Sequence, residues 1–277
     1  EVATVYLINM FSNIWPLHRA IHPLPDDQSQ WPTVDIYLPT FTEDIEIVRI
    51  TATAATQIDY PADKLNIYIL DDGGTEQRRH NELLCASANY RNRKLNKIAD
   101  ELGIHYITRE KNLKAKAGNI NNAFQQTNGD ILLILDCDHV PSQDILKNTL
   151  GWFFKDDKLA LVQTPHFFIN PDPVEKSLGS FRRAPSENEM FYRGIQPAID
   201  LWNATFFCGS AALLRRTCLE EMGGLVGETI VEDCESSINM HAKGYRSVYI
   251  GRPMVCGLSP ETFEDFLVQR SRWCQGM

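Results

Sequence analysis

The chain alternates between short, continuously apolar runs and longer segments in which apolar residues recur at helical spacing. Short apolar runs bounded by turn residues are typical of strands that are buried on both faces. We predict such strands at 34–39, 65–70, 104–109, 131–135 and 158–165. We predict helices between them at 43–57, 76–102 and 116–127. This order predicts an α/β fold, with a mostly parallel sheet and helices on both of its faces.

The second half of the chain has a weaker pattern. Residues 166–204 hold prolines, aromatic residues and charges with little periodicity. Clearer segments follow, and we expect a strand or loop at 206–214, a helix at 228–245, a short strand at 247–250 and an amphipathic helix at 261–273. The helix at 228–245 carries acidic residues in its first turn, where they complement the helix dipole.

Both ends of the chain are apolar and aromatic. Neither end contains the run of about 20 apolar residues that a membrane-spanning helix needs. Two interpretations remain open for the segments 2–25 and 263–277. They form core helices, or they lie at a bilayer surface as the edges of a segment from a longer membrane protein.

Composition narrows the class of protein. A chain of 277 residues suits one large α/β domain or two small ones, and 43% hydrophobic residues are typical of a globular protein. The formal net charge of −9 argues against a nucleic-acid-binding surface, although a local basic cluster can still bind an anion. The seven cysteines form no CxxC pair, so we expect a reducing compartment and no disulfide framework or structural zinc site.

Acidic or polar clusters follow three of the predicted strands, at 41–44, 71–74 and 136–139. In parallel sheets, ligands bind at the carboxyl ends of the strands. Asp136 and Asp138 are separated by one residue, so on an extended segment their carboxylates share a face. Hard oxygen ligands of this kind suit Mg²⁺ or Mn²⁺, which commonly bridge to substrate phosphates. The alternative is a solvated loop after a strand.

Two further stretches suggest nucleotide chemistry. Asp71 and Asp72 precede two glycines, which indicates either a simple turn or a site where a carboxylate accepts hydrogen bonds from a nucleobase or ribose. One arginine and three lysines cluster between Arg109 and Lys116 at a predicted strand-to-helix junction. A helix N-terminus with a lysine is a natural phosphate site, and the alternative is a solvated basic face.

The last two candidates lie near the C-terminal end. Glu232 and Asp233 lie near the start of the helix predicted at 228–245. They either complement its dipole or supply a general base whose pKa is raised by its surroundings. Gln269, Arg272 and Trp273 lie on the last predicted helix. Trp offers a flat face for a sugar ring and Arg a fixed cationic fork, while the alternative is an amphipathic helix at a membrane surface.

The order of DDGG, DCD, FFCGS, VED and QRSRW along the chain resembles the signature of the processive family 2 glycosyltransferases, which include the catalytic subunits of bacterial cellulose synthases. The resemblance extends over residues 31–277. It implies a GT-A, Rossmann-like domain at 31–277 with an interfacial helix at its C-terminal end, preceded by a membrane-proximal lead-in at 1–30.

The resemblance also implies roles for individual residues. Asp71 and Asp72 would contact the uridine of the donor, with Phe41 and Glu43 beside the base. The residues implied at the diphosphate and its Mg²⁺ (or Mn²⁺) are Lys116, Asp136, Asp138 and Arg272.

The acceptor side is implied in the same way. Asp233 would deprotonate the acceptor hydroxyl, with Glu232 as its neighbour. The residues implied along the acceptor channel and at the acceptor end are His166, Phe207, Cys208, Gly209, Gln269 and Trp273.

The activity implied by the resemblance is a single inverting displacement from UDP-glucose onto the non-reducing end of a nascent β-1,4-glucan. It would take place at the cytoplasmic face of a bacterial inner membrane, with flanking membrane segments and a possible accessory subunit. Val231 and Phe41 stand where cellulose synthases usually have Thr and Tyr, so a β-1,3-glucan (curdlan) synthase is an alternative. A non-processive transferase and a nucleotide-sugar sensor without turnover are further alternatives.

Overall fold

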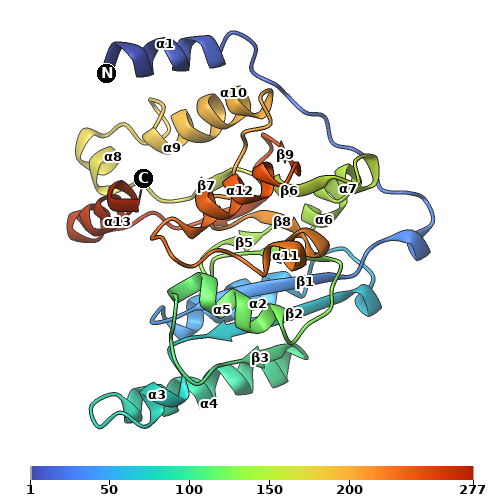
Figure 1. Cartoon of the computed structure of the whole chain (residues 1–277). Helices are drawn as coiled ribbons and strands as arrows, with labels where there is room; N and C mark the ends of the chain where they lie inside the picture. The colour runs from blue at the N-terminus through green and yellow to red at the C-terminus, as the bar shows by residue number, and fades with distance from the viewer. Residues whose placement is uncertain (1, 277) are drawn as a thin grey trace.

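The computed structural model describes residues 2–276. Within them, a central sheet has the strand order β3-β2-β1-β4-β8-β6-β9 (Figure 1). Its strands are β1 (Val34–Thr40), β2 (Leu65–Asp71), β3 (His105–Ile107), β4 (Ile131–Ile134), β6 (Leu159–Gln163), β8 (Ala212–Arg215) and β9 (Arg246–Tyr249). Strand β8 runs antiparallel to β4 and β6, and all other pairs are parallel. The predicted mostly parallel sheet is confirmed.

Helices cover both faces of this sheet, as predicted. One core includes residues of α2 (Ile45–Ala55), α4 (Cys85–Leu102), α6 (Ile145–Thr149) and α7 (Gly151–Lys155). The other core includes residues of α5 (Ala115–Phe124), α11 (Arg216–Met222) and α12 (Glu232–Ala242). Side chains alternate between these cores along β1, where Ile36 and Leu38 enter the first and Tyr37 the second. This two-sided burial explains why the strand is mostly apolar, and its buried Asp35 is hydrogen-bonded to Arg216 and to the Gly129 backbone.

The predicted helix at 76–102 is interrupted. The structure has a short α3 (Glu76–Arg79), a turn, and then α4. In the turn, the Asn81 side chain accepts hydrogen bonds from the backbone N–H groups of Leu83 and Leu84, at 3.0 and 3.1 Å. An asparagine that bonds its own neighbours in this way competes with the helical hydrogen bonds, and the helix breaks there.

The weakly periodic region is an irregular layer above the sheet. Its helical elements are α8 (Pro173–Leu178), α9 (Glu187–Glu189), the π-helix η3 (Met190–Ile195) and α10 (Gln196–Asp200). A small sheet lies beside it, formed by β5 (Val140–Pro141), β10 (Val255–Gly257) and β7 (His166–Phe168). The remaining elements are α1 (Val2–Ser12), η1 (Gln28–Gln30), η2 (Ala62–Lys64) and α13 (Phe263–Gly276).

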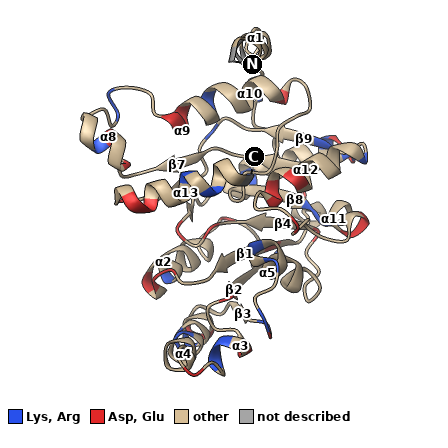
Figure 2. Ribbon diagram, turned by 60° about the vertical axis from the view of Figure 1, so that its left-hand side comes forward, with Lys and Arg blue, Asp and Glu red and all other residues tan. Residues whose placement is uncertain are grey.

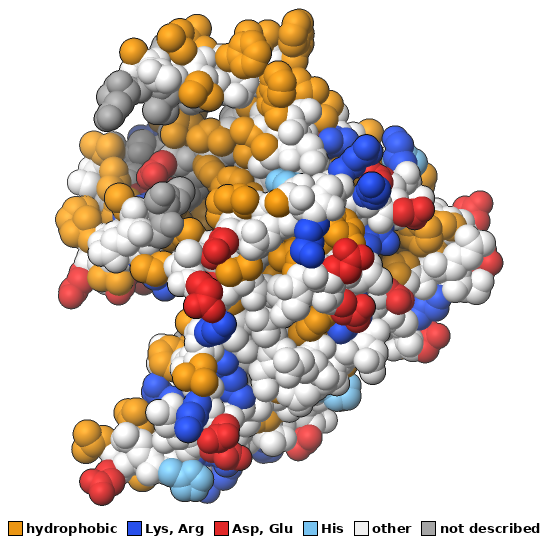
Figure 3. Space-filling model, viewed as in Figure 1, with side chains coloured by type: hydrophobic (Ala, Val, Ile, Leu, Met, Phe, Trp, Pro, Cys, Tyr) orange, Lys and Arg blue, Asp and Glu red, His pale blue; other side chains and the backbone are white. Residues whose placement is uncertain are grey.

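The N-terminal helix α1 is not a core helix. It lies apart from the sheet, above α10 (Figure 1), and Phe11 packs against Trp202 with ring centroids 5.5 Å apart. The exposed large apolar residues here are Leu7, Ile8, Met10, Phe11, Ile14, Trp15, Leu201 and Trp202. Hydrophobic side chains gather over this end of the molecule (Figure 3).

The C-terminal helix α13 is also superficial. Phe263, Leu267 and Val268 leave at least half of their surface exposed, at 59%, 50% and 65%. The interpretation of both end segments as core helices is therefore wrong. Among residues 2–276, no helix combines the length and the apolar composition that a bilayer crossing requires.

Candidate active site

The three polar clusters predicted at strand ends meet at one edge of the sheet. Strand β1 pairs with β2 on one side and with β4 on the other, and all three run in the same direction. Thr40 at the end of β1 is in register with Asp71 at the end of β2. The acids that follow β4 therefore lie beside these two ends, as the sequence predicted.

Asp71 is fully buried, and its carboxylate accepts three hydrogen bonds from the protein. One oxygen accepts hydrogen bonds from Arg91 Nε at 2.8 Å and from the backbone N–H of Gly73 at 2.9 Å. The other accepts from the Tyr106 hydroxyl at 2.8 Å. Through these hydrogen bonds, Asp71 holds the turn after β2 in place.

The loop after β1 is held by Glu43 and Arg91. The Glu43 carboxylate accepts hydrogen bonds from Thr40 Oγ1 at 2.8 Å and from the backbone N–H of Phe41 at 2.6 Å. Arg91 donates to the Glu43 carbonyl oxygen at 2.5 Å. Phe41 is 39% exposed, and the Arg78 guanidinium lies over its ring, 4.7 Å from the centroid, so this side chain is partly open to a ligand beside the loop.

Asp72 pairs with Arg109 rather than standing free. Arg109 Nε and Nη2 donate to the two Asp72 oxygens at 2.6 and 2.7 Å. Burial raises the pKa of Asp72, and the Arg109 guanidinium opposes that rise. Arg109 also donates to the carbonyl oxygens of Leu113 and Ala115, at 2.7 and 2.9 Å. It therefore fixes the loop that leads into α5.

That loop places Lys116 in the first turn of α5. The Lys116 ammonium donates to Asp136 Oδ1 and to the carbonyl oxygen of Gly209, the latter at 2.8 Å. The surrounding protein favours the neutral amine, but the carboxylates of Asp136, Glu232 and Asp233 outweigh it and raise the pKa of Lys116. Lys116 is thus a cation at the centre of the candidate site. Figure 2 shows basic residues in blue at α5 and acidic residues in red on α12.

Asp136, Asp138 and His139 form a candidate metal centre. One ligand atom from each residue lies within 4.8 Å of the others. Two carboxylates and an imidazole fit Mg²⁺ or Mn²⁺. Ser210 Oγ supports this group, because it accepts from the backbone N–H of Asp136 at 2.8 Å and lies 2.7 Å from His139 Nδ1. The sequence analysis did not single out His139 as a candidate ligand, although it directly follows the second aspartate.

Asp233 and Glu232 begin α12, where Val231 is the N-cap and offers no side-chain cap. Burial raises the pKa of both carboxyl groups. A methyl group placed on Gly209 would lie 3.2 Å from Asp233 Oδ2 and 3.6 Å from Lys116 Nζ. The carboxylate and the ammonium therefore face a common space in front of Gly209.

The model of Glycosyl transferase family group 2 matches residues 131–277, about half of the chain. The chain belongs to this glycosyltransferase family. It is 44% identical over 273 residues to a cellulose synthase catalytic subunit (UDP-forming) of Xanthomonas axonopodis pv. citri. It is 43% identical over 279 residues to the cellulose synthase 1 catalytic subunit (UDP-forming) of Komagataeibacter xylinus. These alignments cover 99% and 100% of the chain but 35% of each relative, so the chain spans about a third of their length.

Solved structures agree with the predicted fold. A mannosyltransferase from Pyrobaculum calidifontis in complex with GDP-Man and Mn²⁺ has a TM-score of 0.67 at 20% identity, over 99% of this chain and 68% of that one. The TarS protein of S. aureus has a TM-score of 0.53 at 16% identity, over 87% of this chain and 39% of the TarS chain. At these identities the likeness concerns the fold alone, and it confirms a GT-A-like domain.

In this glycosyltransferase, the residues around 206–211, for which the sequence predicts a place on the acceptor side, form the loop before β8. Phe207 is 1% exposed and packs in the second core. The backbone N–H of Cys208 donates to Gln163 Oε1 at 2.9 Å, and burial raises the pKa of the Cys208 thiol well above its usual value. His166 Nε2 lies 3.0 Å from the Ser210 carbonyl oxygen, and burial lowers the pKa of His166 to about 3. Both Cys208 and His166 are therefore neutral here.

The predicted residues on α13 are not joined to the carboxylate cluster. Within residues 2–276, Gln269 and Arg272 form no hydrogen bond or ion pair with it. Their neighbour Arg270 stacks on Trp273, 4.6 Å from the ring centroid, and pairs with Glu187 at 3.3 Å. The donor and acceptor roles of Gln269, Arg272 and Trp273 remain predictions.

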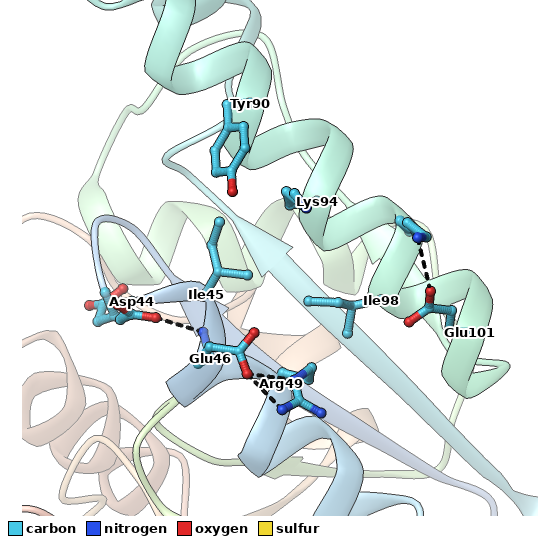
Figure 4. A pocket seen from close by; sticks show the side chains of 10 residues that line it. Asp44, Ile45, Glu46, Arg49, Tyr90, Lys94, Ile98 and Glu101 are labelled. Atoms are coloured by element: carbon cyan, nitrogen blue, oxygen red, sulfur yellow. Dashed lines mark hydrogen bonds and ion pairs between the residues drawn. The ribbon is translucent and has the colours of Figure 1, made fainter.

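A hollow of about 490 Å³ lies outside this centre, between α2 and α4 (Figure 4). Its floor includes Ile45 and Ile98, and the ion pair of Glu46 with Arg49 lies at its edge. It includes Glu43 from the loop after β1 but none of the residues of the candidate metal centre. We therefore assign the chemistry to the strand ends and not to this hollow.

Proposed function

We propose that this chain is the catalytic domain of an inverting transferase that moves glucose from UDP-glucose to the non-reducing end of a growing β-1,4-glucan. The observation that carries the proposal is the common space in front of Gly209. It is bordered by Lys116 and Asp233, with the candidate metal centre one hydrogen bond away through Asp136. The names of the relatives favour cellulose as the product and give no support to the β-1,3 alternative.

Each residue has a defined chemical task in this proposal. Asp233 accepts the proton of the acceptor hydroxyl, whose oxygen forms a bond to the anomeric carbon as the bond to UDP breaks. The raised pKa of Asp233 brings this carboxylate closer to the basicity that proton transfer requires. Lys116 offsets negative charge on the departing diphosphate. A divalent cation held by Asp136, Asp138 and His139 would supply Lewis-acid stabilisation of the same charge.

The donor base would rest on the exposed ring of Phe41 and on the backbone of the loops after β1 and β2. The Arg91–Asp71 and Arg109–Asp72 ion pairs hold these loops in place. A rigid backbone surface of this kind binds its ligand without the loss of conformational entropy that ordering a flexible loop would cause. This arrangement supports Asp71 and Asp72 as determinants of uridine binding through the shape of the pocket.

We also propose that the apolar end of the molecule faces the cytoplasmic surface of a bacterial inner membrane. Phe11 and Trp15 of the lead-in are 59% and 75% exposed, and Trp202 of the adjoining layer is 55% exposed. Aromatic side chains gathered at one end are typical of contact with the interfacial region of a bilayer. Flotation with liposomes tests this, and the triple substitution of these residues by Ser should abolish it.

The reaction is tested by linkage analysis. The protein in membrane vesicles is given labelled UDP-glucose with Mg²⁺, and the product is digested with a β-1,4-specific or a β-1,3-specific glucanase. We expect only the first enzyme to release label. Asp233→Asn should abolish synthesis while UDP binding persists, and the exposed Glu221→Gln on α11 should change neither. A wild-type protein that binds UDP-glucose and never turns it over would instead be a sensor.

A further inference from the structure

Asn121 connects the helix that carries Lys116 to the segment that leads to the helix of Asp233. Its Nδ2 donates to the carbonyl oxygen of Leu225 at 2.7 Å, and its Oδ1 accepts from the backbone N–H of Leu225 at 2.8 Å. The two residues are 104 positions apart in the chain. One amide side chain thus makes the paired contact that a neighbouring strand would make.

The adjoining glycine shows how closely this segment approaches α5. Gly224 has a φ of +102°, a conformation that favours glycine. A methyl group on Gly224 would lie 2.5 Å from Asn121 Oδ1 and 2.9 Å from its Cγ. Any larger residue at 224 would push the segment away from Asn121. The close approach and the paired hydrogen bonds therefore belong to one clamp, formed by Asn121, Gly224 and Leu225.

The clamp is linked to the start of α12. The next residue, Val226, donates its backbone N–H to Ser236 Oγ at 3.0 Å. Ser236 is fully buried and donates to the carbonyl oxygen of Glu232 at 2.6 Å. A second link, from Lys114 to Glu228 at 2.6 Å, joins exposed side chains and contributes less because water screens it. The path from Asn121 to the first turn of α12 thus consists of buried or half-buried hydrogen bonds.

We propose that Asn121 is a positioning residue that holds Asp233 at its working distance from the Lys116 ammonium. The positions of Lys116 and Asp233 both depend on α5, because this helix carries Lys116 and is connected to α12 through the clamp. The inference rests on the proposed function, in which Lys116 binds the departing diphosphate and Asp233 takes the acceptor proton. A displacement of the base by about 1 Å costs a proximity-dependent reaction about 100-fold in rate.

The test compares Asn121→Ala with Asn122→Ala in the membrane-embedded protein. Asn122 is the matched control, because it is the next residue of α5 and its Nδ2 has no hydrogen-bond partner within residues 2–276. We expect Asn121→Ala to lower kcat about 10- to 100-fold while the KM for UDP-glucose and the Kd for UDP change less than about twofold. Amide hydrogen exchange at Leu225 should accelerate, and Asn122→Ala should match the wild type in every measurement.

Two further variants guard against a simple loss of folding. Asn121→Asp keeps the acceptor for the Leu225 N–H and loses the donor to its carbonyl oxygen, so an intermediate kcat is expected. Gly224→Ala opens the clamp from the other side and should reproduce the kcat loss with Asn121 intact. The proposal is overturned by wild-type kcat in a variant whose Leu225 amide exchanges faster, or by a loss of UDP binding equal to the loss of kcat. A wild-type protein without turnover would overturn the proposed function instead, while exchange at Leu225 would still report on the clamp.

Discussion

Arg91 and Asp71 form a buried ion pair that ties α4 to the end of β2, with Arg91 Nε 2.8 Å from Asp71 Oδ1. Their side chains are 11% and 0% exposed. The same guanidinium donates to Thr40 Oγ1 at 2.6 Å and to the Glu43 carbonyl oxygen at 2.5 Å. One arginine therefore fixes both loops that would receive the nucleotide.

Substituting Arg91 should weaken both folding and nucleotide binding. In Arg91→Met, the Asp71 carboxylate loses its cationic partner while it stays buried, and such losses cost about 3–5 kcal/mol. We expect the free energy of urea unfolding to fall by about that amount and the Kd for UDP to rise. Arg93→Met is the matched control, since Arg93 is an exposed residue of the same helix. Equal stability of the two variants would contradict the role of Arg91.

Lys116 and a divalent cation should compete for Asp136. The Lys116 ammonium donates a hydrogen bond to Asp136 Oδ1, an oxygen that a divalent cation would also need. Lys116→Met removes this competitor, so we expect tighter binding of Mn²⁺ alone in a paramagnetic-resonance titration. The same substitution should lower turnover of UDP-glucose, because the diphosphate loses its cationic partner. These opposite signs distinguish the proposal from general damage to the site, which would weaken both.

Lys111→Met provides the control for the Lys116 variant. Lys111 is exposed, and its one ion pair among the described residues 2–276 is with the neighbouring Glu110, at 3.5 Å. We therefore expect neither Mn²⁺ binding nor turnover to change. Weaker Mn²⁺ binding in Lys116→Met would show that the lysine supports the metal centre rather than competing with it.

The sheet and its acidic edge could be predicted because strands that are buried on both faces are recognisable by their apolar sequences. Strands such as 34–40 and 131–134 are buried on both faces, so every position is apolar or hydrogen-bonded within the protein. Asp136 and Asp138 stand out because they follow such a strand immediately. The place of these acids at the sheet edge then follows from the direction of parallel strands.

The residues that hold the site together could not be predicted in the same way. Arg91 lies on an otherwise polar stretch of α4, and its contacts are 20, 48 and 51 positions away. The sequence places Arg109 among the lysines of a candidate phosphate site, whereas in the structure Arg109 pairs with Asp72. The spacing of polar residues along the chain does not indicate which distant residue each of them will contact. Their roles are therefore visible only in the folded structure.

Ser210 should control the affinity of the metal centre without touching the ion. Its hydroxyl contacts the backbone N–H of Asp136 and Nδ1 of His139. Groups that orient metal ligands in this way typically change metal affinity about 10- to 100-fold when they are removed. We expect Ser210→Ala to weaken Mn²⁺ binding by such a factor in isothermal titration. Ser142→Ala is the control, since within residues 2–276 the Ser142 side chain makes no hydrogen bond to Asp136, Asp138 or His139. A matching affinity for the two variants would argue against this role.

The buried carboxyl group of Asp233 should make activity and stability respond to pH in opposite directions. Burial raises the pKa of Asp233 in the folded protein, while the Cys234 backbone N–H and the Lys116 ammonium oppose the rise. A base works only when ionised, so kcat/KM should increase as the pH rises through this raised pKa. The folded protein holds the proton more tightly than the unfolded chain, so the stability that Asp233 contributes is lost over the same rise.

Asp233→Asn separates these two effects. The amide carries no charge, so this variant should gain stability relative to the wild type as the pH rises from about 4 to 8, and it should have no measurable glucan synthesis throughout. Urea unfolding at each pH gives the difference in free energy, and initial rates of UDP release give the activity. Glu232→Gln should show the same sign of stability change, because burial also raises the pKa of Glu232. This variant still contains Asp233 as the proton acceptor. A stability difference that shrinks with rising pH would mean that Asp233 is ionised through a favourable ion pair, and its assignment as a base of raised pKa would fail.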